Sequence, residues 1–231
     1  MSSFSRRQKA IKRIHLLLLK MSGKEKVIDI SWPLTKKATS YRNRSLFNLS
    51  KSKTFQRDHK RETKITLSSH SGTHIDAQSH FLENGKTIDQ YDLHKLVGNC
   101  RVLDFTKLKK RITATDLKPH KIKKNEIILL KTHNSFHTET DQFDEQFVYL
   151  SPSGATYLKE KKVKAVGIDY LGIERGDIHH NTHRTLLKAE IPIIEGLRLA
   201  MADTKKYYFV CLPLAIQDID AAPARAILIE K

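Results

Sequence analysis

The chain has 231 residues, of which 39% are hydrophobic and 29% are charged. This composition suits one globular domain with a sizeable core and excludes a wholly disordered chain. The net charge is +17, but the basic residues after position 26 are not interleaved with aromatic ones. We therefore interpret the excess as solvated lysines and predict no nucleic-acid partner. No stretch approaches the ~20 apolar residues of a membrane helix, so no membrane association is predicted either.

The first residues are interpreted as a basic N-terminal extension, residues 1–25, ahead of one domain over residues 26–231. The apolar run at residues 14–19 is interrupted by His15 and lacks a small-residue cleavage site, so it is not read as a signal peptide. Cys100 and Cys211 lie in apolar, strand-like runs, which favours buried free thiols over a disulfide. A cytoplasmic protein is expected.

The apolar patterning predicts the following elements in chain order. A first strand covers residues 27–31, and residues 36–60, which are polar and basic, are expected to form a mobile loop. Residues 64–69 alternate like a strand. Further strands are predicted over residues 100–105, 126–131, 164–169, 191–195, 207–212 and 226–230, and helices over 113–117, 155–162 (with Ser151 as cap) and 182–190. This order predicts an α/β fold, a compact single domain with a mixed β-sheet and flanking helices.

Three histidines and an aspartate fall within eleven residues: His70, His74, Asp76 and His80. Imidazole nitrogen and carboxylate oxygen together suit zinc, manganese or iron. His74 and Asp76 are two residues apart, so their side chains point the same way on an extended segment. Gly72 allows a tight turn that brings His70 towards them. With twelve histidines in the chain, some clustering arises by chance, but this combination favours a metal site.

A second pair lies downstream. His183 falls in the predicted 182–190 helix, and Glu195 ends a very apolar strand, where an unpaired carboxylate would be costly to bury. Taken alone, the pair fits a metal site and a salt-bridged strand end equally well.

Together these residues resemble the cyclase family, which includes bacterial kynurenine formamidases and isatin hydrolases. The family pattern H-x-G-T-H-x-D-x-P-x-H-F is matched by His70, Gly72, Thr73, His74, Asp76, His80 and Phe81. His183 and Glu195 hold the family's spacing, and the resemblance covers roughly residues 26–231.

The resemblance implies a compact fold of the swivelling β/β/α type, assembled as a homodimer or higher oligomer. It implies one or two divalent ions per subunit, zinc or manganese. His70, His74 and Asp76 would bind the first ion, and Asp76 would bridge to a second ion held by His183 and Glu195. His80 would be the acid/base. The implied reaction is hydrolysis of an amide C–N bond in a small molecule, N-formylkynurenine giving kynurenine and formate.

The chain departs from the family at three places. Gln78 stands where the family has proline, and Gly172 replaces a serine that is common after Asp-Tyr-Leu. Residues 36–44 replace a proline- and glycine-containing stretch that shapes the substrate pocket. Hydrolysis of another cyclic amide or lactone, as by isatin hydrolases, therefore stays open. Two alternatives from other classes are a basic nucleic-acid-binding protein, which chelation would not affect, and a structural metal module, which would normally be cysteine-rich.

Overall fold

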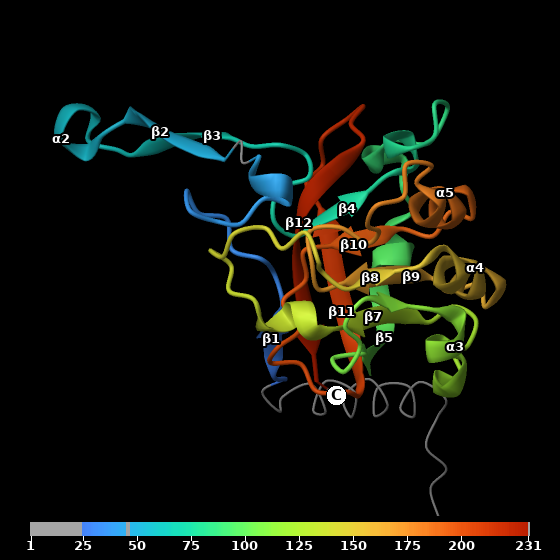
Figure 1. Cartoon of the computed structure of the whole chain (residues 1–231). Coiled ribbons are helices and arrows are strands. Elements are labelled where there is room, and N and C mark those ends of the chain that lie inside the picture. Colours follow the sequence, from blue (N-terminus) through green and yellow to red (C-terminus); the bar gives the residue numbers. More distant parts are fainter. Residues whose placement is uncertain (1–24, 45–46, 231) are drawn as a thin grey trace, which may run out of the picture.

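The computed structural model of the chain describes residues 25–44 and 47–230 (Figure 1). The predicted extension over residues 1–25 lies outside the described residues except for Glu25. The strands are β1 (Val27–Asp29), β2 (Asn48–Lys53), β3 (Glu62–Thr66), β4 (His74–Asp76), β5 (Val97–Asp104), β6 (Arg111–Ile112), β7 (Ile127–Lys131), β8 (Tyr149–Leu150), β9 (Ala165–Ile168), β10 (Ile193–Glu195), β11 (Lys206–Pro213) and β12 (Ala221–Ile229). The helices are α2 (Phe55–Asp58), α3 (Ala114–Leu117), α4 (Pro152–Glu160) and α5 (Asn181–Lys188), with short 3₁₀ turns that include η1 (Tyr41–Asn43) and η2 (Gln78–His80).

Eight strands form one mixed sheet in the order β1-β12-β11-β5-β7-β9-β10-β4. Strands β5, β7, β9 and β10 run parallel to one another, and the other pairings are antiparallel. Strand β4 pairs with both β10 and β12, which closes the sheet into a barrel. The predicted single α/β domain with a mixed sheet is confirmed. The closure of this sheet into a barrel was not predicted from the sequence.

The strands have two apolar faces because successive side chains alternate across a sheet. Ile75, Leu129 and Phe209 belong to the cluster that fills the barrel. Ile128, Val166 and Ile193 belong to a second cluster, together with Leu158 of α4 and Leu186 and Leu187 of α5. Helices α3, α4 and α5 cover the parallel strands from this outer side (Figure 1). Strands buried on both faces explain why the sequence shows continuous apolar runs there.

Most sequence-predicted elements are confirmed within a few residues. Helix α4 begins after Ser151, whose hydroxyl accepts a hydrogen bond from the Gly154 amide at 3.3 Å, as the capping prediction requires. The prediction of an irregular loop over residues 36–60 is wrong. That stretch contains η1, β2 and α2, and β2 pairs with β3 in a hairpin that projects from the barrel (Figure 1).

Strand β2 and helix α2 escaped prediction, whereas the alternation over residues 64–69 had predicted part of β3; every residue of the two strands except Lys53 is exposed. The sequence of β2 carries no apolar alternation from which a strand could be predicted. Among the described residues, no helix has the length and apolar character needed to cross a bilayer.

Candidate metal centre

The centre of the site is built where β4 and β10 pair on the outer face of the barrel. In the antiparallel register His74 is the direct partner of Glu195, and Ile75 that of Ile194. Because both isoleucines point into the barrel, His74, Asp76 and Glu195 point outward. All three are buried, and His74 Nε2 lies 3.4 Å from both Asp76 Oδ1 and Glu195 Oε2. The predicted same-side placement of His74 and Asp76 is therefore what the structure shows.

Helix α5 brings His183 to the same point. Its buried face carries His183, Leu186 and Leu187, three and four residues apart, so anchoring the leucines in the core directs the histidine at the barrel wall. His183 Nε2 lies 3.3 Å from Glu195 Oε1 and 3.5 Å from Asp76 Oδ2. Its other ring nitrogen, Nδ1, lies 2.9 Å from Glu174 Oε1.

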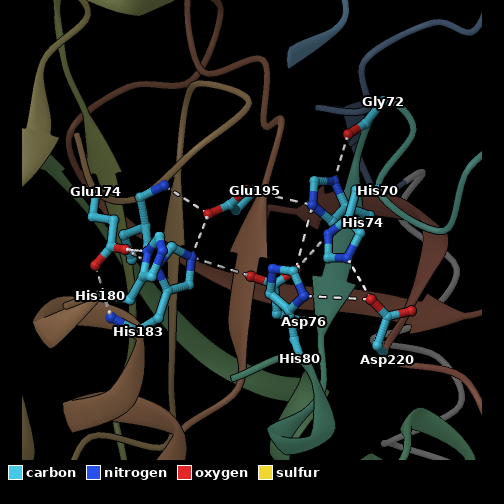
Figure 2. Close-up of polar contacts among 11 residues, drawn as sticks. His70, Gly72, His74, Asp76, His80, Glu174, His180, His183, Glu195 and Asp220 are labelled. Atoms are coloured by element: carbon cyan, nitrogen blue, oxygen red, sulfur yellow. Dashed lines mark hydrogen bonds and ion pairs between the residues drawn. The ribbon is translucent and has the colours of Figure 1, made fainter. Parts of the chain in front are cut away.

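His70 and His80 approach Asp76 from the opposite side (Figure 2). His70 lies in the turn before β4, where Gly72 adopts a φ of +59°, and its Nδ1 is 3.1 Å from Asp76 Oδ1. His80 lies in η2, with its ring centroid 4.1 Å from that of His70. The structure thus gathers the other five predicted site residues around Asp76.

The buried polar atoms fit a cation. Neither oxygen of Asp76 has a hydrogen-bond partner within the described residues, and neither does His74 Nε2. The nearby nitrogens are in ion-pair range, but they are not aligned as donors. A carboxylate buried in this state is costly unless it coordinates a metal.

Two groups of side chains of ligand type share Asp76: His70 with Asp76 and His80, and His74 with Asp76 and Glu195. A shared carboxylate suits a pair of ions. These groups differ from the predicted assignment, which put His74 with His70 on the first ion and His183 with Glu195 on the second. Here His74 is grouped with Glu195, and His80 joins His70 within ligand range. A third group consists of Glu174, His180 and His183, and in it Glu174 contacts the ring nitrogen of His183 that points away from Asp76.

The ionisation of the site is set by these contacts. Burial works against charge, but His183 and His70 hold the pKa of Asp76 well below its usual range. Similarly, burial opposes charging His70, yet Asp76 and Asp220 raise its pKa to about 9. In Glu195, burial and the charge of Asp76 are outweighed by His183 and His74, which lower the pKa to about 2. The same contacts raise the pKa values of His70 and His183, so that protons on these two rings balance the charge of the carboxylates, a role that a divalent cation would take over.

Two acidic residues of the site were missed in the sequence. Asp220 Oδ2 lies 3.0 Å from His70 Nε2 and 3.3 Å from His80 Nδ1. Glu174 lies against His183 and also contacts His180. Asp220 directly precedes β12, and Glu174 follows β9 by six residues. An acidic residue near the end of a buried strand is a pattern that could have marked both as candidates. This pattern does not predict which histidine each residue contacts.

A cavity of about 750 Å³ opens over the cluster. His70, His74, His80, His183 and Glu195 form its polar floor, while its walls include Leu34, Tyr41, Phe81, Leu171 and Ile178. Polar groups converging in an otherwise apolar cavity are typical of a small-molecule site.

The Cyclase family model matches residues 28–175 of the chain. The chain belongs to the cyclase family.

Named relatives and solved structures agree with this assignment. A kynurenine formamidase of Bacillus cereus is 33% identical over 166 residues, which cover 71% of this chain and 78% of that protein. A solved structure described as a potential metal-dependent hydrolase with cyclase activity is 37% identical, with a TM-score of 0.82 over 90% of this chain and 98% of that one. Isatin hydrolase A from Labrenzia aggregata is 19% identical, with a TM-score of 0.80 over 94% of this chain and 98% of that one, and shows the shared fold. The comparisons support a cyclase-family hydrolase.

Proposed function

We propose that the protein is a metal-dependent hydrolase of an amide C–N bond, and that its substrate is N-formylkynurenine, which it converts to kynurenine and formate. The observation that carries this proposal is the buried Asp76 carboxylate, which two groups of ligand-type side chains share, the other members of these groups lining the floor of the cavity. In this proposal the bound ions are zinc or manganese, and their ligands are His70, His74, Asp76, His183 and Glu195. The kynurenine formamidase relatives support the substrate.

The protein's own residues divide the work. A bound divalent cation acidifies water and polarises a carbonyl oxygen. His80 is the acid/base: burial lowers its pKa, so the ring is neutral near pH 7 and able to accept a proton. With Nδ1 directed at Asp220, Nε2 is the nitrogen that takes the proton from the attacking water. His80 then returns this proton to the leaving nitrogen as the C–N bond breaks, which gives a free amine and formate.

A second candidate is a cyclic amide of the isatin type. It is favoured by the cavity wall, because residues 38–42, in the stretch that departs from the family pattern, line the cavity. A different wall changes which ring or chain is accepted and leaves the hydrolytic floor unchanged.

The test is hydrolysis of N-formylkynurenine and of isatin by purified protein, with added zinc or manganese and with a chelator. Formate release that the chelator abolishes supports the proposal, and the ratio of kcat/KM for the two compounds decides between the candidates. Turnover that persists in the metal-free protein would refute a metal-dependent mechanism.

We also propose a homo-oligomer, a dimer or larger, in the cytoplasm. The β2–β3 hairpin exposes the cross-strand pair Leu49 and Ile65 and, near its tip, Phe55. A two-stranded hairpin is marginally stable alone, so packing of this apolar surface on a second copy would stabilise it. Sedimentation of the protein and of a Leu49→Ser, Ile65→Ser variant tests this: the variant should dissociate.

A further inference from the structure

Gly172 follows β9 by four residues and lines the cavity. The ring of Tyr41 fills the space beside it. A Cβ atom at position 172 would lie 3.2 Å from Tyr41 Cε2 and 3.4 Å from Phe147 Cζ. Gly172 does not have a positive φ, so the backbone does not require glycine there. The missing side chain makes room for the Tyr41 ring.

Hydrogen bonds also fix the chain segments on either side of Tyr41. The segment before it is tied to residues 139–141, because the Thr39 amide donates to the Glu139 carbonyl at 2.8 Å and the Thr39 hydroxyl to the Asp141 carbonyl at 2.6 Å. The segment after it is tied to Phe143, whose amide donates to Asn43 Oδ1 at 3.0 Å. The turn that carries Tyr41 is therefore fixed at both ends.

The Tyr41 ring rests on an aromatic support. It meets Phe143 edge-on, with centroids 4.9 Å apart, and Phe143 packs in turn on Tyr170 at 5.3 Å. Phe147 stacks on Tyr170 at 5.0 Å. A ring supported in this way loses little freedom when a ligand packs on it, which makes it an effective binding surface.

Tyr41 faces the reaction site. It lines the cavity with the cluster residues His183 and Glu195, and the residue remains 39% exposed despite the contacts below it. Phe81, which packs against His183 with centroids 4.5 Å apart, lines the same cavity. A flat, apolar substrate group placed over the cluster would find aromatic surface on the wall that Tyr41 forms.

We propose that Tyr41 is a specificity-determining residue whose ring binds the aryl group of the substrate, and that the absence of a side chain at Gly172 lets this ring lie close against the wall. The inference rests on the proposed function in that the substrate is an aryl amide, and it adds the residue that selects the aryl group. It accounts for two of the departures from the family pattern at once, the altered 36–44 segment and the glycine at 172.

The experiment compares Tyr41→Ala, Tyr41→Phe, Gly172→Ala and the double variant Tyr41→Ala/Gly172→Ala with the wild type, and Phe136→Ala serves as a control because Phe136 is exposed and does not line the cavity. KM and kcat for N-formylkynurenine, the Kd of kynurenine by calorimetry, and bound metal are measured in each. Tyr41→Ala should raise KM and Kd about tenfold with kcat changed less, while Tyr41→Phe stays within about twofold of the wild type.

Gly172→Ala should raise KM and Kd about threefold in the wild type and not at all once Tyr41 is alanine, because the two residues act through one contact. Unchanged KM and Kd in Tyr41→Ala, or equal effects of Gly172→Ala in both backgrounds, would overturn the inference. If the wild type binds kynurenine in a Tyr41-dependent way without hydrolysing N-formylkynurenine, the proposed reaction fails and this inference stands. Absence of kynurenine binding by the wild type overturns the inference itself.

Discussion

Gly72 and Gly196 lie backbone against backbone beside the candidate metal centre. A Cβ atom at position 196 would lie 2.8 Å from the Gly72 carbonyl carbon and 3.1 Å from Thr73 Cα. Both glycines have a positive φ, +59° at Gly72 and +69° at Gly196. The Thr73 hydroxyl donates to the Gly196 carbonyl at 2.5 Å and accepts from the Trp32 amide at 2.7 Å. This contact holds the turn before β4 against the end of β10, and so sets His74 beside Glu195.

Gly196→Ala should therefore destabilise the protein by about 3 kcal/mol, because the added methyl collides with backbone and the φ is unfavourable for alanine. Gly176→Ala is the matched control, since Gly176 has the same φ of +69° with nothing within 4 Å of an added Cβ. It should cost about 1 kcal/mol. Urea unfolding of both variants measures the difference. Equal losses would show that the close approach of Gly72 contributes nothing.

His74→Ala should abolish metal binding. His74 is buried, and its Nδ1 is paired with the Gly72 carbonyl at 2.9 Å, which leaves Nε2 for a cation. Losing a ligand should weaken affinity by more than the about 10–100-fold that loss of an outer partner costs. Metal content by elemental analysis is the measurement, with His94→Ala as an exposed control. Full occupancy in His74→Ala would remove His74 from the ligand set.

The sequence predicted the buried part of the molecule well, because burial leaves a pattern. Strand β7 (Ile127–Lys131) begins with four apolar residues that are buried on both faces of the sheet, and this run predicted the strand. The two-residue spacing of His74 and Asp76 also predicted a shared direction, since that follows from the geometry of any strand. Strand β2 of the projecting hairpin has no buried face and left no such pattern.

Tertiary contacts of the site could not be predicted in the same way. Asp220 meets His70 across 150 positions of sequence, and Glu174 meets His183 through the turn that precedes α5. Nothing in the local spacing of either residue identifies its partner. Closure of the barrel by β4 could not be predicted for the same reason. In the sequence, this strand of three residues, which pairs on both edges, looks like the end of a longer strand.

The two thiols should be unreactive in the folded protein. Both cysteines are free and buried, and burial raises the pKa of Cys100 to about 12 and that of Cys211 further still. A raised pKa keeps a thiol protonated as pH increases from 7 to 9, so little of the nucleophilic thiolate forms in this range. Ellman's reagent should modify no thiol of the native protein within minutes at either pH, and two thiols in guanidinium chloride. Rapid labelling at pH 7 would contradict the buried placement.

Asp220→Asn should lower kcat/KM about 10–100-fold, because the carboxylate orients both His70 and His80. Asparagine keeps the shape but loses the charge and one acceptor. Asp218→Asn is the control two residues away, on an exposed side chain. Both variants should retain the wild-type Tm within a few degrees, since Asp220 is part-exposed. An activity loss of the same size in both variants would argue against a specific orienting role.

His80→Ala separates two roles for this histidine. As the acid/base, its loss should reduce kcat by about 10²–10⁴-fold while metal content stays at the wild-type level. As a ligand, which its grouping with His70 and Asp76 also permits, its loss would lower metal affinity and leave activity recoverable at high metal concentration. Turnover is therefore measured over a range of added zinc or manganese, together with bound metal. A deficit that excess metal does not repair supports the acid/base role, because proton transfer to the leaving nitrogen needs the imidazole itself.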